Sequence, residues 1–198
     1  MKARLISATV MFVLVLSAGA AEKPPRISTL YDRIGAKMAQ SPALAEAVGS
    51  PAPELRGAAW MVGRWNVTAR VFTEKAEPKE SDHGQSTVEE ILGGTWFQIR
   101  DTYEGQPQDL GFLTFNVATK EWIAIGIDKS GNAVTSKAKA WDGNRLALVA
   151  EDADILGERV VLRQMLEKRS DREYRVLNEE RLPNGEWAVI DEYVYRKQ

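Results

Sequence analysis

The stretch that decides the fold runs from Gly63 to Phe72 and reads GRWNVTARVF. Apolar and polar side chains alternate along it, which would place on one face Trp65, Val67, Ala69 and Val71. A period of two predicts a β-strand that buries one face and solvates the other, as is typical of antiparallel sheets. The stretch therefore indicates a domain built from antiparallel strands.

Turn-forming residues recur about every 10–12 residues from this strand to the C-terminus, the spacing expected of β-sandwiches and barrels. Between them we predict about ten strands, at 64–73, 85–92, 95–104, 110–117, 121–128, 132–140, 145–151, 158–168, 173–182 and 187–196. No helical periodicity interrupts them, which disfavours parallel βαβ units. The expected fold class is all-β, an antiparallel up-and-down (meander) barrel of about eight to ten strands, because closure removes exposed edges.

The residues before the barrel predict a short helical segment. Within 21–53, one helical face would carry Ile27, Leu30, Tyr31, Ile34 and Met38. Ser41-Pro42 is typical of the start of a second helix. A docked helix pair and a loosely attached extension both fit this pattern. The predicted organisation is a signal peptide at 1–20, an N-terminal extension at 21–53 and the barrel at 54–198.

The residues up to Ala20 have the layout of an export signal. Lys2 and Arg4 precede an uncharged apolar run at 5–16, and small residues follow. This order is typical of a secretory signal cleaved after Ala20, and the run is shorter than the about 20 residues of a membrane-spanning helix. The bacterial lipid anchor requires a cysteine, and the chain has none. We therefore expect a periplasmic or secreted protein without a membrane anchor.

The charge of the chain argues against nucleic acid as a partner. The signal holds two of the 26 Lys and Arg residues and none of the 28 Asp and Glu residues, so the mature chain would carry a net charge of −4. The two signs are interspersed rather than blocked. The absence of cysteine also excludes disulfides and thiolate metal sites.

Gly63-Arg64-Trp65 opens the first predicted strand, just after a predicted helical turn at 53–61. This resembles the Gly-x-Trp signature of lipocalins and related calycin barrels, in which the tryptophan closes one end of the barrel. A basic residue near the end of the last strand packs over that tryptophan in these families. The resemblance implies that Arg196 plays this part, with Gly63 and Trp65 as the other structural barrel-end residues; such a cation contributes about 0.5–2 kcal/mol.

Residues from about 54 to 198 are also similar to a group of uncharacterised exported bacterial domains with a lipocalin-like barrel. The matching pieces are Gly93-Gly94, the strand at 111–115, Asp128 before Ser130-Gly131, Trp141-Asp142-Gly143 and the hairpin at 183–187. The second motif of the lipocalins, in the middle of the chain, is not present. The resemblance therefore implies the barrel and leaves membership in the lipocalins proper open.

The common catalytic and metal motifs are not found. The single histidine, His83, lies in a polar stretch and is predicted to be a solvated loop residue; haem ligation is the sharper alternative. Calcium loops that would begin at Asp128 and Asp152 fail at their last positions, Lys139 and Arg163. No phosphate-binding glycine motif occurs. We expect no catalytic residues of these kinds, no metal and no cofactor.

Acidic residues in the predicted strands are the remaining candidates for chemistry, namely Glu89-Glu90, Asp101, Glu179-Glu180 and Asp191-Glu192. Alternation turns adjacent side chains to opposite faces. Outward carboxylates would form cross-strand ion pairs with arginines such as Arg100, Arg163, Arg175 and Arg181. An inward carboxylate could orient a ligand or transfer a proton.

We predict a protein that binds a small apolar or amphipathic molecule inside the barrel, rather than an enzyme. The expected ligand contacts are Tyr103, Trp122, Gln164, Asn178, Glu180 and Tyr193, with Tyr195 as a further aromatic candidate. One alternative is a cofactor-free isomerase, cyclase or hydratase that uses a cavity carboxylate; another is an interaction or scaffold protein with a filled barrel. Apolar and polar residues alternate in the same way along the strands of hollow and filled barrels, so the sequence does not distinguish these functions. It does not give the oligomeric state either.

Overall fold

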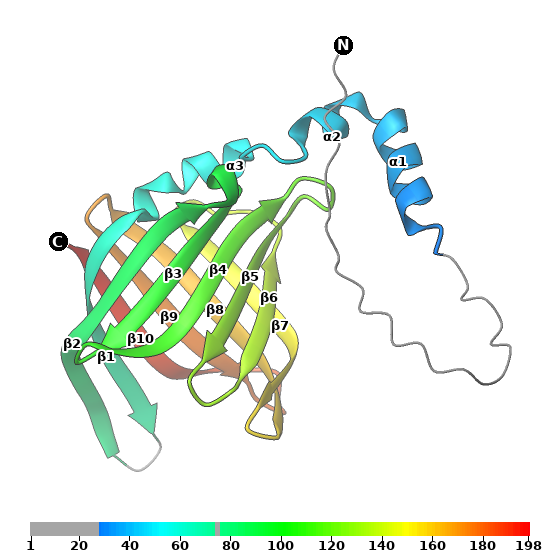
Figure 1. The fold of residues 1–198 in the computed structure, drawn as a ribbon. Coiled ribbons are helices and arrows are strands. Elements are labelled where there is room, and N and C mark those ends of the chain that lie inside the picture. Colours follow the sequence, from blue (N-terminus) through cyan, green and yellow to red (C-terminus); the bar gives the residue numbers. More distant parts are fainter. Residues whose placement is uncertain (1–27, 74–75) are drawn as a thin grey trace, which may run out of the picture.

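The computed structural model describes residues 28–73 and 76–198, and in it ten strands close into an antiparallel barrel (Figure 1). The strands are β1 (Gly63–Thr73), β2 (Ala76–Ile91), β3 (Trp96–Tyr103), β4 (Gln106–Asn116), β5 (Glu121–Asp128), β6 (Ala133–Ala138), β7 (Arg145–Ile155), β8 (Glu158–Ser170), β9 (Glu173–Arg181) and β10 (Trp187–Lys197). Each pairs with its neighbours in sequence, and β1 also pairs with β10. The predicted up-and-down barrel is confirmed.

The largest difference from the predicted strands is the start of β2. This strand begins at Ala76 rather than near residue 85, because residues 79–81 pair with residues 69–71 of β1. The polar sequence of this stretch does not alternate, so its strand character comes from the pairing and not from burial. His83, predicted in a loop, therefore lies on a strand, where its exposed ring meets Tyr103 edge-on with 6.2 Å between centroids.

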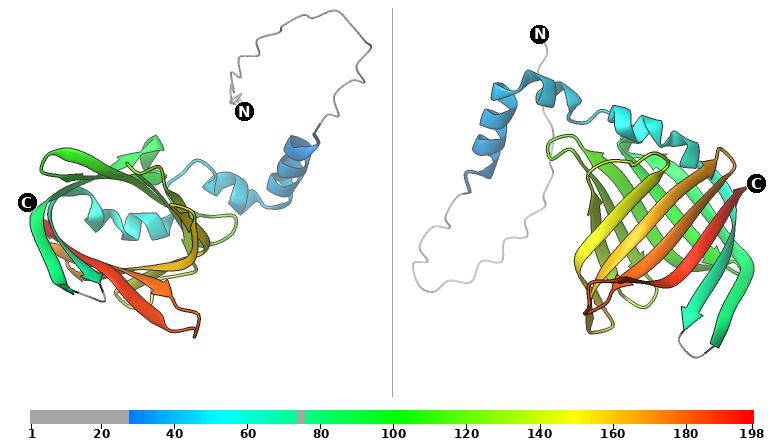
Figure 2. Two further views of the ribbon diagram at one scale, coloured as in Figure 1. Left: turned by 90° about the horizontal axis from the view of Figure 1, so that it is seen from below. Right: turned by 180° about the vertical axis from the view of Figure 1, so that it is seen from behind.

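Short helices precede the barrel: α1 (Leu30–Gln40), α2 (Pro42–Ala47), α3 (Pro53–Gly57) and the 3-10 turn η1 (Ala59–Met61); a second 3-10 turn, η2 (Leu92–Gly94), joins β2 to β3. α1 and α2 bury none of their residues and extend away from the barrel (Figure 1). α3 and η1 lie across one end of the barrel (Figure 2). None of the helices in residues 28–73 and 76–198 is long and apolar enough to cross a membrane. The predicted signal at 1–20 lies outside the described residues.

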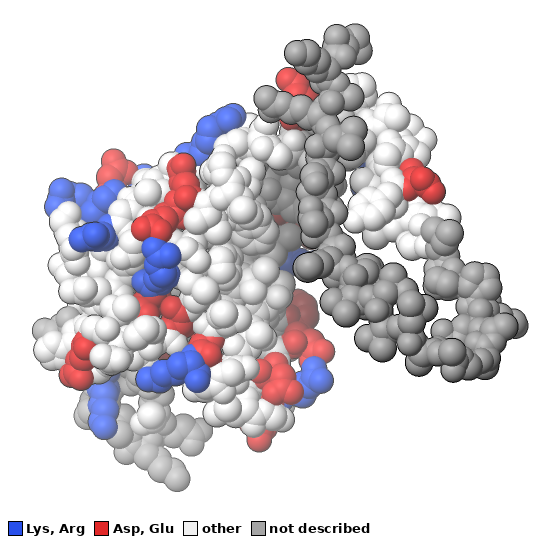
Figure 3. Space-filling model, in the orientation of Figure 1, with Lys and Arg blue, Asp and Glu red and all other residues white. Residues whose placement is uncertain are grey.

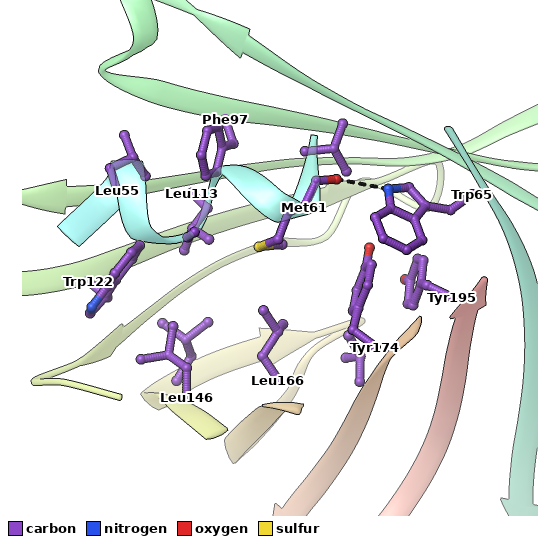
Figure 4. Packing of buried hydrophobic residues seen from close by; sticks show 14 of the residues in the cluster. Leu55, Met61, Trp65, Phe97, Leu113, Trp122, Leu146, Leu166, Tyr174 and Tyr195 are labelled. Atoms are coloured by element: carbon purple, nitrogen blue, oxygen red, sulfur yellow. Dashed lines mark hydrogen bonds between the residues drawn. The ribbon is translucent and has the colours of Figure 1, made fainter. Parts of the chain in front are cut away.

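α3 and η1 form a plug at this end of the barrel (Figure 4). Leu55 and Met61 are buried in it. The indole of Trp65 is fully buried and donates from Nε1 to the Met61 carbonyl at 2.8 Å. The same ring meets Tyr174 edge-on with centroids 4.8 Å apart, and Tyr174 stacks on Tyr195 at 4.2 Å. Trp65 of β1 therefore connects the plug to β9 and β10, the last two strands of the barrel.

The cation over Trp65 is Lys197, which corrects the expectation of Arg196 by one residue. The register of β1 and β10 places Lys197 opposite Trp65, with Nζ 5.2 Å from the ring centroid. Arg196 is exposed on the outer face and donates from Nε to Glu173 at 3.2 Å, because neighbouring strand residues face opposite sides. Gly63 leaves room for this contact, since a Cβ there would come within 3.0 Å of Lys197 Cε.

Charged side chains form a ladder of alternating sign on the outer face of the barrel. The ladder runs from Arg145 through Glu167, Arg175, Glu192 and Arg70 to Glu80, with N–O distances of 2.7, 3.8, 3.3, 3.5 and 2.7 Å. Figure 3 shows basic and acidic side chains interspersed on one face of the molecule. Outward ion pairs of this kind account for several of the strand carboxylates, whereas Asp101 and Asp191 face the interior.

Candidate functional site

A cavity of about 440 Å³ occupies the half of the barrel away from the plug. Its walls are mainly apolar and include Ile99, Leu113, Leu148, Leu162, Leu166 and Val176. Met61 of η1 lines its inner end. Its mouth lies at the opposite end of the barrel, where Asp109 lies in the first half of β4 and Asp128 ends β5. The volume falls in the range of about 300–1,000 Å³ found for small-molecule sites.

Small residues on the inner wall keep this half of the barrel hollow. Gly111 of β4 stands directly opposite Gly126 of β5, and both line the cavity. A Cβ on Gly126 would meet no atom within 4 Å, so this glycine faces open space. Toward the plug the same strands carry Leu113 and Trp122, which are almost fully buried. The barrel is therefore filled at one end and hollow at the other.

Carboxyl groups from three strands line the cavity: Asp101 of β3, Asp109 of β4 and Asp191 of β10. Asp101 and Asp109 are direct cross-strand partners, so their side chains share a face with about 4.5–5.5 Å between Cβ atoms. In the described part of the chain, none of the three forms an ion pair with Lys or Arg. Nor do residues 28–73 and 76–198 contain a group of three metal-ligating side chains.

β-Bulges set the register at two of these acids. On β4, Gln108 is an extra residue, and it shifts the pairing so that Asp109 stands opposite Asp101. On β10, Ile190 is the extra residue just before Asp191. A bulge changes which side chains of a strand share a face, and bulges are frequent beside functional sites. Without the bulge in β4, Gln108 would occupy the place of Asp109.

Burial and mutual repulsion raise the pKa values of the cavity carboxyls. The pKa of Asp101 is raised to about 7, first because burial removes water from the carboxylate and second because the charge of Asp109 is close. Burial also raises the pKa of Asp191, and that of Asp109 although it keeps solvent contact at the mouth. The pKa of Asp128 is lowered instead, chiefly because the Asn132 side chain donates to Oδ2 at 2.7 Å. The site thus holds a proton-retaining acid inside and a fixed negative charge at the mouth.

Three of the predicted ligand contacts come together in one hydrogen-bonded stripe on the wall formed by β8, β9 and β10. Gln164 Nε2 donates to Asn178 Oδ1 at 3.2 Å, and Asn178 Nδ2 donates to Asp191 Oδ1 at 2.7 Å. The Tyr193 hydroxyl donates to Asp191 Oδ2 at 3.4 Å. All four residues line the cavity, as does Tyr195. Asp191 is therefore the group that joins the predicted residues.

The other three predicted contacts lie elsewhere. Tyr103 ends β3 and is 37% exposed. Trp122 is in the core, edge-on to Phe115 at 5.6 Å, and borders a separate open hollow of about 600 Å³ beside the plug. Glu180 is half-buried opposite Ala188. Among the described residues, these three side chains are not part of the cavity lining. A side chain must face inward and also lie at the right height along its strand to reach the hollow half of the barrel.

The sequence identifies Asp101 and Asp191 as strand acids, but it selects neither as a ligand contact and does not single out Asp109. The sequence does indicate that Asp191 faces inward, since it lies two residues before the predicted contact Tyr193 and alternate residues of a strand share a face. Asp109 precedes the predicted strand at 110–117, and its partner depends on the bulge at Gln108. Hairpin lengths read from the sequence do not reveal such a bulge.

We expect the Asp101→Asn variant to be more stable than the wild type above neutral pH. The folded chain retains a proton on Asp101 up to about pH 7, whereas the unfolded chain releases it near pH 4, so the free energy of unfolding falls as pH rises through this window. The asparagine variant has no carboxyl group at this position, so its free energy of unfolding lacks this pH-dependent contribution. We predict equal stability at about pH 4 and a gain of about 2 kcal/mol or more at about pH 8, from about 1.36 kcal/mol per pKa unit.

Urea unfolding of both proteins at several pH values measures this difference. The matched control is Asp152→Asn, which makes the same chemical change at an exposed aspartate that pairs with Arg159. A difference between the Asp101 variant and wild type that does not change with pH would contradict the perturbed acid.

Residues 51–197 match the family model described as "Protein of unknown function (DUF1579)". The sequence matches no curated protein. Among solved structures, the chain is similar to the crystal structure of Rv2717c from M. tuberculosis, with a TM-score of 0.56 and 13% identity over 75% of this chain and 99% of that chain. At this identity the likeness is one of fold alone.

A redesigned β-barrel, mFAP1, bound to DFHBI, aligns with a TM-score of 0.32 and 13% identity over 74% of this chain and 100% of that chain. At that TM-score the likeness does not establish a shared fold. The family match, by contrast, spans the helical plug and all strands from β1 to β10. The chain belongs to the DUF1579 family of proteins of unknown function.

Proposed function

We propose that this protein is an exported binding protein that holds a small, mostly apolar molecule with a polar end inside a lipocalin-like barrel. The observation that carries the proposal is the cavity of about 440 Å³, bounded by the plug at one end and by polar groups at the other. The Gly63-x-Trp65 start and the plug that it anchors support the comparison with lipocalin-like barrels.

The lining of the cavity supports this class of ligand. Its apolar wall would remove a hydrocarbon from water, which contributes about 0.8 kcal/mol for each buried CH₂ group. The stripe of Gln164, Asn178 and Tyr193 and the cavity carboxyls would supply the contacts to the polar end. Apolar walls with a few oriented polar groups are the usual composition of small-molecule sites.

The proposed address outside the cytoplasm rests on the sequence of residues 1–20. An exported carrier of this kind would shield an apolar compound from water in the periplasm or the medium. Mass spectrometry of the recovered protein is expected to find Ala21 as the first residue. Recovery of the chain with its residues up to Ala20 still attached would count against export.

Titration with N-phenyl-1-naphthylamine, a neutral apolar fluorescent probe, tests the binding function. We expect the emission to rise and saturate at one probe per chain, with a dissociation constant in the micromolar range, equivalent to about 8 kcal/mol. Displacement of the probe by unlabelled compounds then ranks candidate ligands. An emission that never saturates would sink the proposal.

A second candidate function, acid–base catalysis on the bound molecule, is favoured by one observation. Asp101 lies in the cavity with its pKa raised to about 7, close to the value at which a carboxyl serves best as a general acid or base. Mass spectrometry of the compounds that displace the probe separates the two functions. Recovery of every bound compound unchanged after prolonged incubation would eliminate the catalytic candidate.

A further inference from the structure

We propose that the cavity selects molecules whose polar end is a primary ammonium group, and that Asp101 and Asp109 bind this group. The inference rests on the proposed binding function and narrows its ligand class from apolar molecules in general to amphipathic amines. Three features of the cavity support it: the sign of its charge, the open acceptor capacity of Asp101 and the position of its apolar wall.

The charge of the cavity lining is unbalanced. Its carboxyls are those of Asp101, Asp109, Asp128 and Asp191, and the cation that joins them among the described residues is Arg163. The guanidinium of Arg163 is already used: Nε donates to Glu179 at 2.7 Å, and the group lies 4.2 Å from the centroid of Trp187. The carboxyl groups of the cavity would repel a ligand carboxylate, whereas they would attract a ligand cation.

Hydrogen-bond acceptor capacity is left open at Asp101. Ser86, 1% exposed, stands directly opposite Asp101 across β2 and β3, and side-chain hydrogen bonds with Ser86 and Tyr195 favour the ionised carboxyl. Among the described residues, Asp101 Oδ1 is nevertheless a buried atom without a hydrogen-bond partner of ordinary geometry. Buried polar atoms normally have partners. An ammonium group brings three donors to this wall, a hydroxyl brings one and a carboxylate brings none.

The apolar wall lies where the rest of such a molecule would extend. Ile99 is on the same face of β3 as Asp101, two residues closer to the plug, and Leu113 is on the same face of β4 as Asp109, four residues closer to the plug. Both line the cavity, together with the ring of Tyr195. An ammonium group between Asp101 and Asp109 would therefore direct its hydrocarbon chain toward the plug.

Binding of an ammonium group should depend on pH because it favours the ionised carboxyl of Asp101. Below about pH 7 the site must release a proton to bind, so the affinity should rise with pH and then level off, while an alkylammonium stays protonated to about pH 10. The other titratable or charged groups that line the cavity are Asp109, Asp128, Asp191, Arg163, Tyr174, Tyr193 and Tyr195. Burial raises the pKa of all three tyrosines above their ordinary value, so they stay neutral in this window.

Calorimetric titration with octylammonium, 1-octanol and octanoate tests the inference, because the three probes share one hydrocarbon chain. At pH 8 we expect octylammonium to bind at least about tenfold more tightly than 1-octanol, equivalent to about 1.4 kcal/mol. Octanoate should bind more weakly than 1-octanol. The advantage of octylammonium should shrink at pH 6, whereas the affinity for 1-octanol should not fall.

Variants locate the charge recognition. Asp101→Asn and Asp109→Asn should each remove most of the tenfold advantage of octylammonium over 1-octanol, since they keep the size of the side chain and remove its charge. Asp152→Asn, at an exposed ion pair, is the matched control and should change neither affinity. Either cavity variant suffices if the other fails to fold.

The possible results of these experiments distinguish the ammonium preference from the binding function on which it rests. Octanol or octanoate binding as tightly as octylammonium would overturn the ammonium preference and leave the binding function standing. Cavity variants that keep the full preference would overturn the assignment to Asp101 and Asp109. Failure of the neutral alcohol, the ammonium and N-phenyl-1-naphthylamine alike would remove the binding function itself, and the inference with it.

Discussion

Replacement of Gly126 by phenylalanine is expected to abolish ligand binding and to leave the barrel folded. A side chain at this position would project into the hollow half, because a Cβ there meets no atom within 4 Å. The ring would occupy the volume that a ligand needs and would contact the apolar wall. We expect the affinity for N-phenyl-1-naphthylamine to fall at least about a hundredfold, equivalent to about 2.7 kcal/mol.

Stability distinguishes this effect from unfolding. Glycine inside a strand costs about 0.5–1 kcal/mol relative to alanine, so the phenylalanine variant should melt at the same temperature as the wild type or higher. Gly126→Ala is the matched control: it adds one methyl group to the same position and should bind the probe within about threefold of the wild type. A folded phenylalanine variant that binds normally would move the ligand site out of the cavity, with the open hollow beside Trp122 as the next place to test.

Replacement of Trp65 by alanine is expected to cause the largest loss of stability. The side chain is fully buried, contacts Tyr174 at 4.8 Å between centroids and donates to the Met61 carbonyl at 2.8 Å. Truncation of a buried aromatic residue in a core costs about 3–5 kcal/mol. Because the total stability of a domain is about 5–15 kcal/mol, urea unfolding should show a large decrease in the midpoint.

Two variants separate the contributions of Trp65. Trp65→Phe keeps an aromatic ring but loses the hydrogen bond to Met61, and should cost about 1–3 kcal/mol. Trp96→Ala, at a half-buried tryptophan outside the central core, is the control and should cost less than Trp65→Ala. Since Met61 also lines the cavity, the Trp65→Ala variant should bind the probe more weakly. Equal losses at Trp65 and Trp96 would contradict the role of Trp65 as the anchor of the plug.

Much of the fold can be predicted from the sequence, because local rules determine it. Alternation at 63–72 and regular turn signals predict ten strands, and closure follows because open edges are costly. The prediction is least accurate at β2, whose polar first half is a strand through pairing with β1. Lys197 rather than Arg196 packs over Trp65 for a related reason: register, set by pairing between distant strands, decides which of two adjacent side chains turns inward.

The candidate site could be predicted only in part. Gln164, Asn178 and Tyr193 have inward parity and meet on one wall, which follows from alternation along three neighbouring strands. Trp122 also has inward parity, yet it lies toward the plug, where side chains fill the barrel. The position of a side chain along the barrel axis depends on the stagger of neighbouring strands in the closed sheet, and alternation in the sequence does not predict that stagger.

By itself, the sequence determined the strands, their order and the alternation of buried and solvated faces, because each of these depends on residues close together in the chain. The tertiary structure alone decided that the barrel is hollow beside Gly111 and Gly126, and that Asp101 and Asp109 meet in the hollow. Both outcomes depend on which residues of separate strands stand opposite one another. A single extra residue, Gln108, shifts that register and turns Asp109 toward Asp101.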